Sequence, residues 1–157
     1  MIVVWVSVFT SSEPVATTVA CNAPPPTAAT EPGGPEPAPP LGETVSRSTL
    51  LDVEPAPVSA TRVRVFNANG ERGQATHVAA QLGDYGFASA PDVQAGNDPV
   101  YVDQNMQCHG QIRFGPGGLA AASTVWLVAP CAELIQDTRT DDTVDLALGT
   151  YSREISP

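Results

Sequence analysis

Hydrophobic and polar residues alternate from Thr61 to Phe66, which predicts a strand with two valines on one face. The Asn69-Gly70 pair then predicts a turn, and a second glycine at position 73 adds a flexible point. Apolar residues between 75 and 85 recur at helical spacing, and Gly86 stands where a left-handed helix end is expected. This segment therefore predicts a strand, a glycine turn and a helix.

The same order of elements recurs downstream. Residues Gln111–Phe114 alternate as a strand, Gly115–Gly118 turns the chain, and Leu119–Val128 is an apolar helix stopped by Pro130. Further strands are predicted at 87–93, 133–136 and 144–148. The element order is then β-α-β-β-α-β-β. We expect an α+β fold in which two helices cover one face of a four- to five-stranded sheet.

A proline-rich segment precedes the predicted domain. Eight of the 16 prolines fall between Pro24 and Pro40, among almost no large apolar side chains. Such a segment buries too little surface to offset the entropy lost on ordering. We interpret residues 13–60 as an extended tether, residues 61–152 as the domain and residues 153–157 as a tail.

Residues Met1–Thr10 are apolar and uncharged. A helix that spans a membrane needs ~20 apolar residues, so this run predicts only the outer end of a truncated transmembrane anchor at 1–12. The alternatives are a buried strand or a disordered tail. Val19-Ala20-Cys21 slightly resembles a lipoprotein cleavage site, but the upstream charge of a signal peptide is absent. The anchor, with the domain outside the membrane, is the preferred reading.

The composition is acidic, with a formal net charge of −10, seven arginines and no lysine. The lack of lysine and the bias toward Ala, Pro and Arg are typical of high-GC coding, as in actinobacteria. No basic face is available for nucleic acid. Arg62, Arg64 and Arg113 alternate away from the inward residues, so they are predicted to share the open face of the sheet. They are then candidates for binding a ligand, but cross-strand pairing with Glu133 or Asp145 is the preferred interpretation.

Three cysteines suggest one disulfide. Cys108 lies just before the second predicted strand–helix unit and Cys131 just after it. A helix that doubles back along its strand brings these two positions together, so we predict a Cys108–Cys131 bridge. It would stabilise the domain by ~3 kcal/mol and indicates an oxidising compartment. Cys21 is left over, either free or paired between molecules.

No catalytic constellation is evident. His109 is next to Cys108, but adjacent strand residues point to opposite faces, which suits a thiol nucleophile poorly. These two residues and Cys131 lack a fourth zinc ligand. The glycines after Phe66 have no lysine beside them, so tight turns explain them better than a phosphate loop. We predict no metal and no cofactor.

Several segments together carry a resemblance to a known family. These segments are Val63–Gly70, Gly73–Ala75, Tyr85–Phe87, Ile112–Ala122 and Val144–Gly149. Together they resemble the LytR C-terminal domain family. The resemblance implies an extracytoplasmic, membrane-anchored protein of the cell envelope. Such domains often follow a LytR-CpsA-Psr catalytic domain, for which this chain has no room, so no catalytic residue is carried over.

The sequence thus predicts a non-enzymatic module that maintains the cell envelope by binding a wall component or a protein partner. The binding surface is expected on the sheet face or on the Asn67–Gly73 turn. An enzyme that hydrolyses or transfers envelope polymers is the alternative, and the missing nucleophile or acid–base pair argues against it. The candidate ligand-binding residues are Arg62, Arg64, Arg113, Asn67, Asn69 and Arg72.

Overall fold

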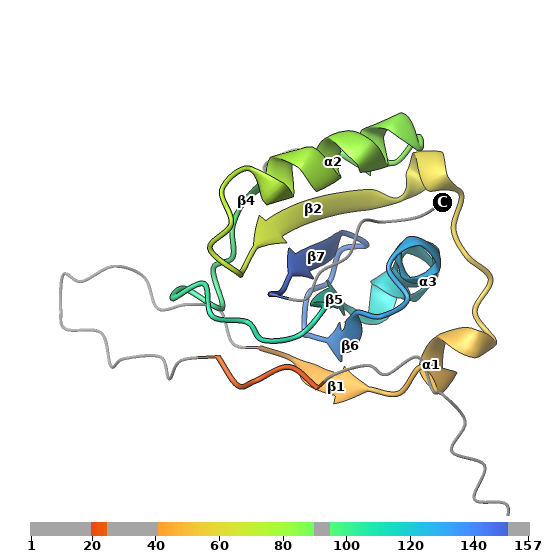
Figure 1. Ribbon diagram of the computed structural model, residues 1–157. Helices are drawn as coiled ribbons and strands as arrows, with labels where there is room; N and C mark the ends of the chain where they lie inside the picture. The colour runs from red at the N-terminus through yellow and green to blue at the C-terminus, as the bar shows by residue number, and fades with distance from the viewer. Residues whose placement is uncertain (1–19, 25–40, 90–94, 151–157) are drawn as a thin grey trace, which may run out of the picture.

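Both predicted strand–turn–helix units are present in the structure, a computed structural model that describes residues 20–24, 41–89 and 95–150 (Figure 1). The elements in chain order are β1 (Glu43–Val45), α1 (Ser48–Leu51), the 3-10 turn η1 (Val58–Ala60), β2 (Arg62–Asn67), α2 (Gln74–Asp84), β3 (Ala88–Ser89), β4 (Ala95–Asn97), β5 (Gly110–Phe114), the 3-10 turn η2 (Pro116–Gly118), α3 (Leu119–Val128), β6 (Glu133–Gln136) and β7 (Val144–Leu148).

These strands form one mixed sheet with the order β1-β6-β5-β7-β2-β3, and β4 pairs with β2 beside β3. β2 runs parallel to β7, β3 and β4. β5 runs parallel to β6 and antiparallel to β7, and β1 closes the far edge antiparallel to β6. The predicted α+β class is confirmed. The sheet has seven strands rather than four or five, because β1 and β4 add to the predicted set.

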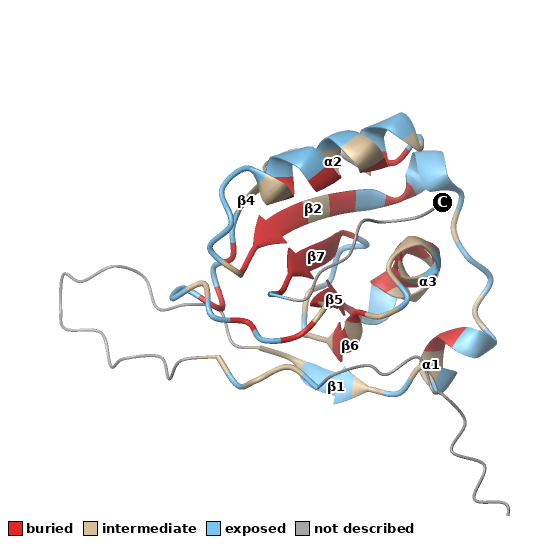
Figure 2. Cartoon of the chain, in the orientation of Figure 1, coloured by how far each residue is buried: buried red, intermediate tan, exposed pale blue. Residues whose placement is uncertain are grey.

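The two longer helices pack on the same face of the sheet, as the sequence predicted. Figure 2 shows the buried residues gathered along the strands and on the sides of α2 and α3 that face them. Burying an aliphatic side chain of this kind stabilises a fold by ~1.5–3 kcal/mol, so this layer supplies most of the folding energy. Its members include Val65, Val78, Leu82, Ile112, Phe114, Ala122, Val125, Leu134 and Leu146.

The opposite face of the sheet is covered as well. The loop between β4 and β5 folds back over it and buries Tyr101, Met106 and Cys108 against Phe66 of β2 and Ala147 of β7. We refer to this covered side as the loop face. The sheet therefore lies between helices on one side and a loop on the other. The sequence predicted an open face on this second side, but the loop covers part of it.

Part of the predicted tether belongs to the fold. The segment 41–60 adds β1 to the sheet edge and places Leu50 of α1 in the helix-side core. The Ala56 backbone N–H donates a hydrogen bond to the carbonyl of Ala120 in α3 at 3.0 Å. The tether predicted at 13–60 therefore includes a segment, 41–60, that belongs to the fold. The sequence did not indicate this, because the elements in that segment are short and show little periodicity.

The predicted anchor at 1–12, the proline-rich residues 25–40 and the tail at 153–157 lie outside the described residues. Among the helices that the structure does describe, none has the length and apolar character needed to cross a bilayer.

Candidate functional site

A surface pocket of about 330 Å³ lies at the carboxyl end of β2. Figure 1 shows that α2 begins beyond this end of the strand and that β4 runs alongside it. Ligands often bind beyond the carboxyl ends of parallel strands, because the connecting loops converge there. Polar groups and glycines dominate the walls. The lining residues are Asn67, Gly70, Arg72, Gly73, Ala75, Thr76, Gly96, Asn97 and Gln104.

Side-chain amides fix the turn that forms one wall of this pocket. The Asn67 side chain accepts a hydrogen bond from the Asn69 backbone N–H at 3.2 Å and donates one to the Glu71 carbonyl. The Asn69 side chain accepts from the Glu71 N–H at 2.8 Å and donates to the Gly149 carbonyl at 2.9 Å. Asn69 also donates to Gln74. Asn69 thus has a structural role, whereas Asn67 both shapes the turn and lines the pocket.

Two glycines give the turn its path. Gly70 and Gly73 both have φ of 78°, a left-handed conformation that side chains disfavour. Open space surrounds the position that a Cβ would occupy at Gly73, so the backbone angle rather than crowding favours glycine there. The Gly70 N–H donates to the Gln104 side chain at 3.3 Å, which ties the turn to the loop after β4.

Arg72 is the unusual group in the pocket. It is exposed, and within the described parts of the chain its guanidinium makes no ion pair and no hydrogen bond. No acidic side chain is among the described lining residues. The first turn of α2 also has no acidic residue and no side-chain cap, so the positive end of the helix faces the same region. Arg72 is therefore the one charged side chain among the described residues that line the pocket.

The three arginines predicted on the sheet face have other partners. Arg64 forms a bidentate pair with Asp145 across β2 and β7, at 2.7 and 3.1 Å. The cross-strand alternative left open by the sequence is therefore present for Arg64. Arg62 approaches Asp142 at 3.9 Å, and both side chains are about half exposed.

Arg139 links Asp137 to Asp145 and extends the Arg64 pair into a network. Burial lowers the pKa of the Arg139 guanidinium, but hydrogen bonds to the two carboxylates outweigh it and leave the pKa raised. The arginine and aspartate charges in this part of the sheet face therefore neutralise one another, and the network holds the turn before β7.

Arg113 is buried under the loop face, with only 3% of its surface exposed. Its guanidinium makes two short hydrogen bonds to Asp98, at 2.6 and 2.8 Å, and two more to Gln111. It also lies over the Tyr101 ring, and burial raises the pKa of that phenol. A ligand could reach Arg113 only after this covered pair opened, so Arg113 is poorly placed for binding.

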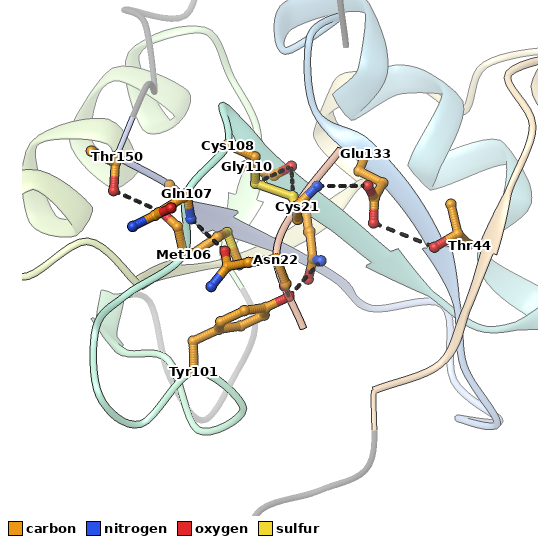
Figure 3. Close-up of a disulfide and its surroundings, with 12 residues drawn as sticks. Cys21, Asn22, Thr44, Tyr101, Met106, Gln107, Cys108, Gly110, Glu133 and Thr150 are labelled. Atoms are coloured by element: carbon orange, nitrogen blue, oxygen red, sulfur yellow. Dashed lines mark hydrogen bonds between the residues drawn. A yellow bond between two sulfur atoms is a disulfide. The ribbon is translucent and has the colours of Figure 1, made fainter. Parts of the chain in front are cut away.

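The disulfide joins Cys21 to Cys108, not Cys108 to Cys131 as predicted (Figure 3). Residues 20–24 lie against the loop before β5. The Asn22 side chain accepts from the Gln107 N–H at 2.6 Å, and the Tyr101 hydroxyl donates to the Asn22 carbonyl at 2.6 Å.

These contacts bring Cys21 to the buried Cys108, while Cys131 stays a half-exposed free thiol. The prediction failed because residues 13–60 were taken as a tether, which left Cys21 without a place in the fold.

Four pocket residues were not anticipated from the sequence: Thr76, Gly96, Asn97 and Gln104. Thr76 lies in the first turn of α2. Gly96 and Asn97 reach the pocket because β4 pairs in parallel with β2, and Gln104 lies in the loop after β4. No sequence pattern marks them, since β4 has only three residues, Ala-Gly-Asn. In the described part of the chain, no group of three or more His, Cys, Asp or Glu residues could hold a metal ion.

Comparison with known proteins gives three matches. Residues 60–151 match the family LytR_C, described as LytR cell envelope-related transcriptional attenuator. The chain is 48% identical over 148 residues to the cell envelope integrity protein Cei of Mycobacterium tuberculosis, covering 94% of this chain. It spans 64% of the length of that relative.

The third match is a crystal structure of the soluble domain of a conserved hypothetical secreted protein from Mycobacterium marinum. The two share 52% sequence identity with a TM-score of 0.69, over 74% of this chain and 77% of that one. This similarity supports the mixed fold described above.

Proposed function

Because this chain belongs to the LytR_C family, as its sequence resemblance predicted, we propose that it is a non-catalytic, extracytoplasmic binding module of the cell envelope. It binds a wall component or an envelope protein partner, and in doing so helps to maintain the envelope. The names of the matched proteins, an envelope integrity protein and a secreted protein, support this setting.

The disulfide supports the proposed location. A disulfide such as the Cys21–Cys108 bridge forms and persists in an oxidising compartment, outside the cytoplasm. We further propose that residues 1–12 are the outer end of a single-pass anchor. The disulfide fixes the chain to the domain at Cys21, and the chain rejoins the domain at Leu41 before β1, so only the residues before Cys21 would separate the domain from that anchor.

The observation that carries the binding proposal is the pocket around Arg72. In a protein with a net charge of −10, an arginine that has no partner among the described residues and lines a polar pocket favours one anionic group at that place. The groups that line the pocket are amides, a hydroxyl, a guanidinium and glycine backbone, which suit recognition rather than proton transfer.

Co-sedimentation with purified, protein-free mycobacterial cell walls tests this proposal. We expect the full-length chain to be retained, and Arg72→Gln to lower retention about tenfold through loss of one charge-assisted contact. Arg62→Gln is the matched control, because it removes the same charge at the other end of β2. Its retention is expected to stay within about twofold of the parent.

Equal retention of the Arg72 and Arg62 variants would show that the wall does not bind at the Arg72 pocket. No retention of the parent chain, on protein-free or on untreated walls, would contradict binding to the wall itself. Turnover of a wall fragment by the purified chain would instead favour the enzyme alternative.

A further inference from the structure

The residues that line the Arg72 pocket indicate which kind of anion fits it, a phosphate monoester or a carboxylate. A phosphate monoester carries close to two charges at neutral pH and is commonly held by several arginines or lysines. Arg72 is the one cationic side chain among the described residues that line this pocket, and the chain has no lysine. A carboxylate, with a single charge and two oxygens, matches one guanidinium fork.

The neutral groups of the pocket indicate what is attached to the carboxylate. Asn97 makes no side-chain hydrogen bond in the described part of the chain, and Gln104 uses only its oxygen, toward Gly70. A free amide offers both a donor and an acceptor, the pair that a peptide group requires. The apolar face of a sugar ring packs well on an aromatic side chain, and the described pocket lining includes none.

The neighbouring sheet edge adds backbone groups of the same kind. β4 pairs with β2 on one side, and no described strand pairs with its other side. Its last two residues, Gly96 and Asn97, also line the pocket. An extended peptide can pair with such an edge while its end enters the adjoining cavity.

We infer that the Arg72 pocket binds the free C-terminal carboxylate of a short, extended peptide. Arg72 pairs with the carboxylate, and Asn97 and Gln104 hydrogen-bond to the last peptide groups. This inference rests on the proposed binding function and names the class of ligand for the same site. The net negative charge of the chain then disfavours long polyanions while the pocket still accepts one carboxylate.

Calorimetric titration of the full-length chain with N-acetyl-alanyl-alanine tests the inference against the same dipeptide with an amidated C-terminus. We expect the acid to bind at least about tenfold more tightly than the amide, since amidation removes one charge-assisted pair. Arg72→Gln should abolish that preference, and the matched Arg62→Gln should keep it. Thr76→Trp, which fills the pocket without changing its charge, should prevent binding of both peptides.

Equal binding of acid and amide, or tighter binding of methyl phosphate or of a simple glucuronide than of the acid peptide, would overturn the inference. Absence of peptide binding in a chain that is still retained on walls through Arg72 would overturn it as well, while leaving the proposed function standing. Loss of wall retention in the parent chain would count against the proposed function instead.

Discussion

Replacing Cys21 with serine is expected to lower the melting temperature of the domain by roughly 15 °C. The Cys21–Cys108 bridge closes a loop with a sequence separation of 87 residues. In the chain-entropy account a loop of this length stabilises the folded state by ~4 kcal/mol, because the cross-link restricts the unfolded chain. The bridge also anchors the contacts of Asn22 with Tyr101 and Gln107, so they should loosen together (Figure 3).

Scanning calorimetry under non-reducing conditions measures this effect. Cys131→Ser is the matched control, because it removes a free, half-exposed thiol and should leave the melting temperature unchanged within about two degrees. Parent protein treated with reductant should melt close to the Cys21 variant. A large loss in the Cys131 variant together with none in the Cys21 variant would point to the Cys108–Cys131 bridge that the sequence first indicated.

Replacing Arg113 with methionine is expected to destabilise the domain by ~3–5 kcal/mol, because it leaves the buried carboxylate of Asp98 without its partner. Asp98 is 2% exposed and also accepts hydrogen bonds from the Val100 and Tyr101 backbone N–H groups. The pair therefore holds the loop that covers the sheet. Urea unfolding monitored by circular dichroism gives the free-energy difference directly.

Arg62→Met serves as the control for Arg113→Met, since the half-exposed Arg62–Asp142 contact at 3.9 Å should contribute no more than ~1 kcal/mol. Similar losses in the two variants would show that the Arg113 pair is not buried as described. The expected contrast also explains why Arg113 is unsuited to binding tests: its removal weakens the fold, whereas Arg72 is exposed and unpaired among the described residues.

The periodicity of the sequence predicted the strands and helices that face the main core. Val63 and Val65 alternate because β2 lies on α2, and the apolar helix Leu119–Val128 buries Ala122 and Val125 in the same core. Such elements bury a regular stripe, and that stripe is visible in the amino-acid order.

Short elements and long-range pairings could not be predicted in the same way. β1 and β4 have three residues each, too few to show a period, and their pairing depends on neighbours distant in the chain. The partner of Cys108 depended on Asn22 and Tyr101, which meet only in the folded protein. Sequence spacing alone therefore favoured Cys131, which is nearer to Cys108 along the chain than Cys21 is.

For the same reason, the sequence predicted one wall of the candidate site but not the other. The glycine turn and Arg72 follow directly from β2, and a turn with two left-handed glycines is visible in the sequence. The opposite wall comes from β4 and the loop after it, which carry no motif. Of the aspartates that pair with the arginines of the sheet face, the sequence indicated only Asp145, the partner of Arg64. Asp142 and Asp98, the partners of Arg62 and Arg113, lie in loops outside the predicted strands.

Nuclear magnetic resonance mapping with enzymatically solubilised cell-wall fragments tests the central claim most directly. The account predicts that backbone amide signals of Gly70, Gly73, Thr76 and Gly96, which surround the pocket, shift on titration, and that Arg72→Gln removes these shifts. Shifts confined to the sheet face around Arg64 and Asp145, or unchanged by the Arg72 variant, would contradict it.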